Sequence, residues 1–102
     1  MKRVLDIGCG NGKYLVFLKS LGFKTDGIDS SPIAVEMTKE ALNDDSNVLL
    51  ADMYEYDFPK EQYDLVISIA AIHHGLKAQV RRTIKQIYTA LLSGGIFFCY
   101  FA

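Results

Sequence analysis

The chain has 102 residues, of which half are apolar and 12% aromatic, and its formal net charge is −1. This length allows a single domain, residues 1–102, and the apolar content excludes a disordered chain. No apolar stretch reaches the roughly 18 residues that a membrane span needs, and no charged-then-apolar signal region opens the chain. We therefore expect a soluble, cytoplasmic domain without a membrane partner and without overall attraction to nucleic acid.

Apolar runs of strand length alternate with helical patterns along the whole chain. This alternation is typical of βαβ units and a parallel sheet, so the predicted fold class is α/β and Rossmann-like. Because crossovers are right-handed and must cover both faces, the expected strand order is 3-2-1-4-5. The predicted strands are Arg3–Ile7, Lys24–Ile28, Asn47–Ala51, Asp64–Ile69 and Ile96–Phe101.

Three helices are predicted between these strands. The first begins near Lys13 and stops at Gly22. The second opens with Ser31 as N-cap and Pro32 at its first position, and runs to about Leu42.

The third helix follows an apolar repeat and is expected to continue up to Gly94-Gly95. Its repeat consists of Val80, Ile84, Ile87 and Leu91.

A glycine-rich turn follows the first strand, with glycine at alternate positions in the run Asp6–Gly12. A P-loop does not fit, because Ile7 stands where its first glycine belongs and Tyr14 where its Ser or Thr belongs. A dinucleotide fingerprint fails at Lys13, where its third glycine belongs. What remains is Asp-x-Gly-x-Gly-x-Gly, or simply a tight strand-to-helix turn.

Two more acids stand where the next two strands end. Asp29 ends the second strand and could accept both ribose hydroxyls of a nucleotide, as in NAD enzymes, or cap the following helix. Asp52 ends the third strand, where it could contact the same ligand or be an exposed loop acid. Cys9 and Cys99 are far apart and match no metal or redox spacing, so we expect reduced thiols and no metal site.

These motifs together resemble those of the class I S-adenosylmethionine-dependent methyltransferases, over nearly the whole chain. The resemblance implies S-adenosyl-L-methionine as cofactor, with its ammonium at Asp6, its ribose at Asp29 and its adenine amino group at Asp52. The other residues expected to bind the cofactor are Gly8, Gly10, Gly12, Ser30, Met53 and Ile69.

The stretch ISIAAIHHGLKAQVRR and the terminal GGIFFCYFA narrow the resemblance. They look like the tRNA wobble-uridine methyltransferases, which esterify 5-carboxymethyluridine. This implies tRNA and a small zinc-binding activator subunit as partners, with His73 and His74 orienting the substrate. Arg81 and Arg82 would then contact substrate or RNA. The histidines could instead be loop residues, and the arginines the solvated face of a helix.

Two other readings share the same cofactor residues. One is a methyltransferase of a small molecule or a protein, and the other is a catalytically silent module that binds the cofactor or docks a partner. Related enzymes also carry elements before the first strand and a strand pair after the fifth, which this sequence lacks, so we expect a fragment or a pared-down domain. The fifth strand would then be an open apolar edge prone to self-association.

Overall fold

The core of the protein is a five-stranded parallel sheet. The computed structural model describes residues 2–43, 47–69 and 71–100. The strands lie in the order β3-β2-β1-β4-β5, which confirms the predicted order. In chain order the elements are β1 (Arg3–Ile7), α1 (Lys13–Ser20), β2 (Lys24–Asp29), α2 (Pro32–Ala41), β3 (Asn47–Leu50), β4 (Tyr63–Ile69), the 3-10 turn η1 (Ile72–His74), α3 (Lys77–Ala90) and β5 (Leu91–Tyr100).

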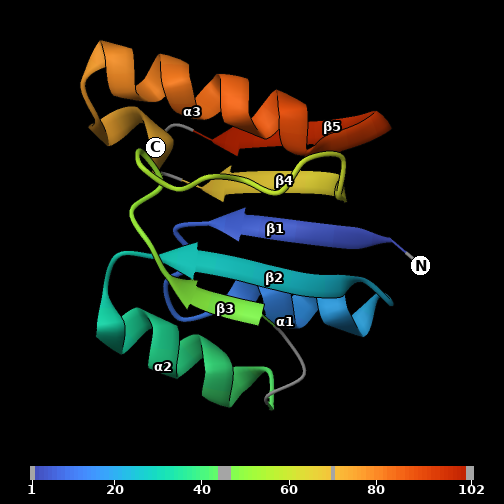
Figure 1. Ribbon diagram of the computed structural model, residues 1–102. Helices are drawn as coiled ribbons and strands as arrows, with labels where there is room; N and C mark the ends of the chain where they lie inside the picture. The colour runs from blue at the N-terminus through green and yellow to red at the C-terminus, as the bar shows by residue number, and fades with distance from the viewer. Residues whose placement is uncertain (1, 44–46, 70, 101–102) are drawn as a thin grey trace.

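The carboxyl ends of all five strands lie along one edge of the sheet, where the arrowheads point in Figure 1. β1 lies in the middle and pairs with both β2 and β4, so that Val4 is opposite Thr25 on one side and Leu65 on the other. The winding of the chain reverses at β1. Folds of this kind bind their ligands outside the carboxyl ends of the strands at this reversal.

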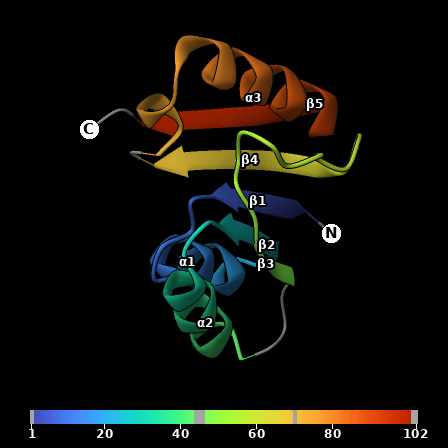
Figure 2. The ribbon, with the colours of Figure 1, turned by 60° about the vertical axis from the view of Figure 1, so that its left-hand side comes forward.

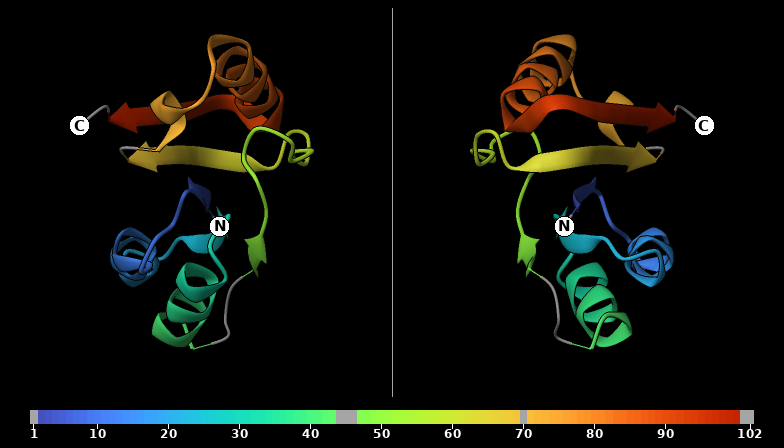
Figure 3. Two further views of the ribbon diagram at one scale, coloured as in Figure 1. Left: turned by 90° about the vertical axis from the view of Figure 1, so that its left-hand side faces the viewer. Right: turned by 90° about the vertical axis from the view of Figure 1, so that its right-hand side faces the viewer.

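Both faces of the sheet are covered. Figures 2 and 3 show α1 and α2 on one face, and α3 with the connection from β3 to β4 on the other. Because successive strand residues point to opposite faces, neighbouring residues of β1 enter different cores. Val4 packs with Leu15 of α1 in one core. Leu5 packs with Phe58 and Ile87 in the other.

The start of α2 confirms the predicted cap. The Oγ of Ser31 accepts a hydrogen bond from the backbone N–H of Ala34 at 3.3 Å, and Pro32 occupies the first helical position. This cap fixes the direction in which the chain leaves the end of β2. The backbone of Asp29 and Ser30 is thereby held at the carboxyl edge of the sheet.

The predicted boundary between the last helix and strand is wrong. α3 ends at Ala90 and β5 begins at Leu91, so Gly94 and Gly95 lie inside the strand and do not end the helix. Leu91 continues the helical spacing but pairs with Tyr63 of β4, and the pairing register shifts just after it. Pairing with β4 therefore prevails over the local helical pattern. Phe101, predicted as the last residue of this strand, lies outside the described residues.

The described residues form neither a helix that could cross a membrane nor a cluster that could hold a metal ion. None of the helices there combines the length and the apolar content that crossing a membrane requires. No three His, Cys, Asp or Glu side chains in the same ranges gather closely enough to hold a metal ion. Cys9 is buried and Cys99 is half-buried, and both are free cysteines.

Candidate functional site

The glycine turn between β1 and α1 uses a backbone conformation that other residues rarely adopt. Gly8, Gly10 and Gly12 have φ values of 76°, 58° and 83°. A Cβ on Gly12 would lie 3.0 Å from Cγ2 of Thr38, so this glycine allows α1 to pack against α2. A Cβ on Gly10 would meet nothing within 4 Å. Main chain is therefore exposed to open space at Gly10, as a ligand-binding turn requires.

Neighbouring elements hold this turn in place. The backbone N–H groups of Gly8 and Cys9 both donate to the carbonyl of Ile28 in β2, at 2.8 and 3.1 Å. The hydroxyl of Thr38, buried in α2, donates to the carbonyl of Gly10 at 2.9 Å. No sequence pattern indicates this role of Thr38, because a threonine inside a helix is usually interpreted only as part of its surface or core.

Asp6 is a buried acid near the carboxyl end of β1. Its side chain is 1% exposed. Neither carboxylate oxygen has a hydrogen-bond donor among the described residues. Burial raises the pKa of Asp6 to about 7, and the nearby carboxylate of Asp29 adds to the rise. A buried carboxylate without donors is costly, so this position is suited to a cationic hydrogen-bond donor supplied by a ligand.

Asp29 links the end of β2 to the glycine turn. One of its oxygens accepts from the N–H of Gly10 at 3.0 Å, and the other accepts from the N–H of Ser31 at 2.9 Å. Each carboxylate oxygen can accept a second hydrogen bond. Asp29 therefore supports the fold locally and can still accept two hydroxyls. The ribose role stays compatible with this geometry, whereas the side chain that caps α2 is that of Ser31.

Asp52 and Met53 follow β3 at the same edge of the sheet. Asp52 is exposed, and its Oδ1 accepts from the N–H of Tyr54 at 2.9 Å, so its side chain also shapes the turn. The Cε of Met53 lies 3.9 Å from where a Cβ of Gly8 would stand. The residues after β1, β2 and β3 thus converge, as the topology predicts.

A small hollow of about 90 Å³ lies among these residues. Pockets for whole ligands usually measure about 300–1,000 Å³, so this one holds only part of a ligand, such as a ring. The remainder would extend over the glycine turn toward Asp6. The hollow is lined by Gly8, Ile28, Asp29, Ser30, Ala51, Asp52, Met53 and Tyr54.

Comparison with known proteins identifies the family. The sequence profile described as "Methyltransferase domain" matches residues 4–95, which is most of the chain. The chain belongs to the methyltransferase domain family.

Two curated relatives of this methyltransferase domain methylate different molecules by name. The tRNA (carboxymethyluridine(34)-5-O)-methyltransferase of Saccharomyces cerevisiae is 34% identical over 96 residues, which cover 89% of this chain and 32% of the relative. Malonyl-(acyl-carrier protein) O-methyltransferase 1 of Ilyobacter polytropus is 32% identical over 96 residues, which cover 90% of this chain and 35% of the relative. The chain spans about a third of the length of these two proteins.

A solved structure shows the same fold. It is a complex between a methyltransferase activator of Haloferax volcanii and a methyltransferase, and the matching chain superposes with a TM-score of 0.86 at 29% identity. The match covers 96% of this chain and 44% of that chain. The methyltransferase domain therefore has the Rossmann-like fold that its sequence predicts.

S-adenosyl-L-methionine is the cofactor of this family, and the residues at the site fit it. The fit rests above all on Asp6, since a buried acid that has no donor within residues 2–43, 47–69 and 71–100 suits the ammonium of the cofactor's methionyl part. Asp29 can take the ribose hydroxyls and Asp52 the adenine amino group. Gly10 leaves space for the ligand beside the main chain.

The segment after β4 lies against the glycine turn. A Cβ on Gly8 would stand 2.9 Å from the Cβ of Ala71, which immediately precedes η1. His74 is exposed in η1, and nothing is described of the side chain of His73. Ile69 is half-buried at the end of β4, opposite Tyr100, and does not line the hollow. The substrate role of the histidines and the cofactor role of Ile69 stay predictions.

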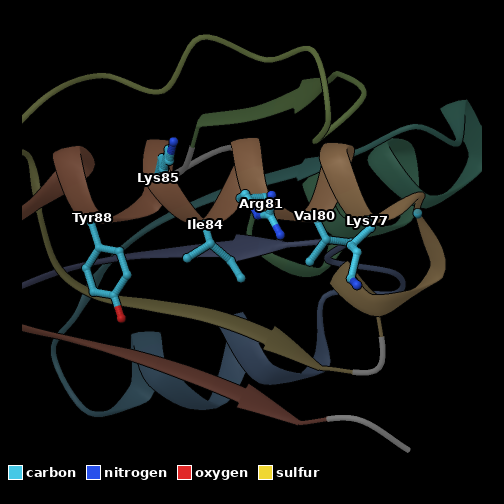
Figure 4. A pocket seen from close by; sticks show the side chains of 7 residues that line it. Lys77, Val80, Arg81, Ile84, Lys85 and Tyr88 are labelled. Atoms are coloured by element: carbon cyan, nitrogen blue, oxygen red, sulfur yellow. The ribbon is translucent and has the colours of Figure 1, made fainter.

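The two predicted RNA-contacting arginines lie in different surroundings on α3. Arg81 is exposed and lines an open groove of about 660 Å³, together with the basic residues Lys77 and Lys85 (Figure 4). Arg82 instead donates hydrogen bonds to its own chain: Nη1 to the carbonyl of Tyr54 at 2.9 Å, and Nη2 to Asp57 at 3.3 Å. The sequence did not predict these contacts, and an RNA contact stays a prediction for both arginines.

Proposed function

We propose that this domain catalyses S-adenosylmethionine-dependent methylation of a carboxylate, and that its acceptor is the carboxymethyl group of the tRNA wobble uridine. The cofactor part of this proposal is supported above all by Asp6, whose buried carboxylate accepts no hydrogen bond from the described residues and lies next to the open glycine turn. It favours a cofactor with a cationic end over one with a pyrophosphate, because a phosphate beside Asp6 would be repelled.

Two relatives support a carboxylate acceptor. Carboxymethyluridine and a malonyl thioester, which the names of these relatives specify, each carry a free carboxylate. A carboxylate is already ionised at neutral pH, so its methylation requires no general base. The domain then has to orient the acceptor and exclude water, which fits the exposed His74 better as an orienting group than as a base.

Each part of the site has a distinct task in this reaction. When bound, S-adenosylmethionine supplies an electrophilic methyl group on its sulfonium. Asp6 holds the ammonium, Asp29 the ribose and Asp52 the adenine. Ala71 lies against the glycine turn and is followed directly by η1, so we expect the domain to present the acceptor at the segment from Ala71 to His74.

We propose two macromolecular partners. Arg81, with Lys77 and Lys85 along the same groove, would contact tRNA phosphates. Arg81→Glu should weaken tRNA binding without changing cofactor affinity, and unchanged tRNA affinity would reject this contact.

A small zinc-binding activator would pair with the outer strand β3, where Leu49 and Leu50 are exposed. Leu49→Lys should abolish co-purification with the activator.

The decisive experiment on the acceptor is mass spectrometry of wobble nucleosides from cells that lack the gene. We expect free 5-carboxymethyluridine to accumulate, and the methyl ester to return when the gene is restored. An unchanged nucleoside profile, despite cofactor binding in vitro, would reject tRNA as the acceptor. Methylation of a small carboxylic acid or protein would then be the second candidate, supported by the malonyl-specific relative. Absence of any transfer would indicate a silent cofactor-binding module.

A further inference from the structure

The connection that carries Asp52 and Met53 has no helix or strand of its own over residues 51–62. Its only local order near β3 is a turn, in which the N–H groups of Glu55 and Tyr56 donate to the carbonyl of Asp52 at 3.0 and 2.9 Å. A segment of this kind keeps a single conformation only if other elements hold its polar backbone groups. In this domain the element that does so is α3.

Three neighbouring side chains of α3 bind the backbone of this connection. The hydroxyl of Thr83, fully buried, donates to the carbonyl of Met53 at 3.1 Å. The guanidinium of Arg82 donates to the carbonyls of Tyr54 at 2.9 Å and Tyr56 at 3.4 Å. The side-chain oxygen of Gln86 accepts from the N–H of Phe58 at 3.0 Å. Together they hold the connection from Met53 to Phe58.

The same connection also contacts the segment after β4. The hydroxyl of Tyr54 donates to the carbonyl of Ile72 in η1 at 3.1 Å. A Cβ on Gly75 would stand 2.5 Å from the Tyr54 ring, so glycine is needed for the ring to lie there. The loop after β3 and the segment that leads into α3 are therefore fixed against each other.

We propose that Arg82, Thr83 and Gln86 are positioning residues for recognition of the adenine. They act through the backbone of residues 53–58, which places Asp52 and Met53 at the hollow beside Gly8. This inference rests on the proposed function, since it assigns Asp52 and Met53 to the base of S-adenosylmethionine. Arg82 acts by binding its own chain, whereas Arg81 beside it is exposed.

The preference of the domain for a ligand with adenine over one with hypoxanthine tests this inference. A purely structural role of these side chains would not change that preference. The full chain is titrated calorimetrically with S-adenosylhomocysteine and with its analogue that carries hypoxanthine in place of adenine. Arg82→Gln removes the charged group on α3 that donates hydrogen bonds to the loop after β3. We therefore expect about tenfold weaker binding of the adenine ligand. The analogue should lose much less affinity, because it lacks the amino group that Asp52 recognises. The preference for adenine should fall accordingly.

Two further variants and a control complete the experiment. Thr83→Val keeps the buried volume and removes only the bond to the Met53 carbonyl, so it should lower the same preference even if the Arg82 variant folds poorly. Lys60→Gln, which removes one exposed positive charge from the same connection, should change nothing.

The outcomes separate the inference from the proposed function. A wild-type chain that binds neither ligand overturns both. Wild-type binding of S-adenosylhomocysteine with an unchanged adenine preference in the Arg82 and Thr83 variants overturns only the positioning role.

Discussion

The cofactor role that we propose for Asp6 would come at a cost in the stability of the folded protein. The carboxylate of Asp6 is buried and has no donor in the described part of the chain, and burial raises its pKa to about 7 from an ordinary value near 3.8. The folded protein therefore binds this proton more tightly than the unfolded chain does. Since the pKa is raised by folding, the free energy of unfolding must fall as pH rises from about 4 to about 7.

We predict that Asp6→Asn removes this pH dependence. Three pKa units correspond to roughly 4 kcal/mol, so above about pH 7 the variant should be more stable than the wild type by up to that amount when no cofactor is bound. Urea unfolding at about pH 5 and pH 8 measures both proteins. If the difference in free energy of unfolding between wild type and variant is the same at both pH values, the pKa of Asp6 is not raised.

The glycine turn offers a second prediction on single residues. Gly10 and Gly22 both have left-handed backbone and open space where a Cβ would stand, but only Gly10 lies beside the acids. Alanine at either position should therefore destabilise the protein by a similar amount, about 1 kcal/mol.

Only Gly10→Ala should weaken binding of S-adenosylhomocysteine, by at least about tenfold, because its methyl group occupies space that the ligand needs. Thermal unfolding measures the loss of stability in both variants, and calorimetric titration measures their affinity for S-adenosylhomocysteine. Equal affinities for the Gly10 and Gly22 variants would mean that the ligand does not approach the turn.

Helices, strands and turns that are determined by consecutive residues can be predicted from the sequence. Strand β1, the turn and the cap of α2 each follow from consecutive residues, and these predictions are confirmed. Leu91 was misassigned because its helical spacing is local, whereas its pairing with Tyr63 depends on a strand 28 residues earlier in the chain.

Among the site residues, long-range contacts were similarly hidden. The run Asp6–Gly12 and the acids after β2 and β3 could be found because strand ends of a parallel sheet meet at one edge. The bond from Thr38 to Gly10 spans 28 residues, and so does the bond from Arg82 to Tyr54. Hydrogen bonds between residues so far apart in the chain leave no periodic pattern in the sequence. For the same reason the lack of donors around Asp6 could be read only from the folded structure.

The outer strand β5 leads to a prediction about association. Its residues Ile96, Phe98 and Tyr100 are exposed on one face, at 63%, 53% and 53%. An apolar outer strand with unpaired backbone groups can pair with another chain. We predict that the 102-residue chain self-associates through β5 and that Phe98→Lys shifts it toward monomer. Light scattering at high concentration measures this, and a monodisperse wild-type monomer would contradict it.

For the molecule as a whole, the sheet gathers at one edge three acids that are distant in the sequence. Asp6 and Asp29 lie in the last two residues of β1 and β2, Asp52 follows β3, and these three strands are adjacent in the sheet. Asp29 and Asp52 also support the fold through hydrogen bonds to backbone N–H groups. Asp6 accepts no such bond from the part of the chain that the structure describes, and we propose that its burial serves ligand binding and not stability.

We propose that Asp6 binds the cationic end of the cofactor, and calorimetric titration with S-adenosylhomocysteine measures this interaction. Wild type and Asp6→Asn are compared in the full chain at about pH 8, where the carboxylate is ionised. We predict that the variant binds at least about tenfold more weakly although it is the more stable protein. Absence of wild-type binding, or equal affinity in the two proteins, would contradict the account.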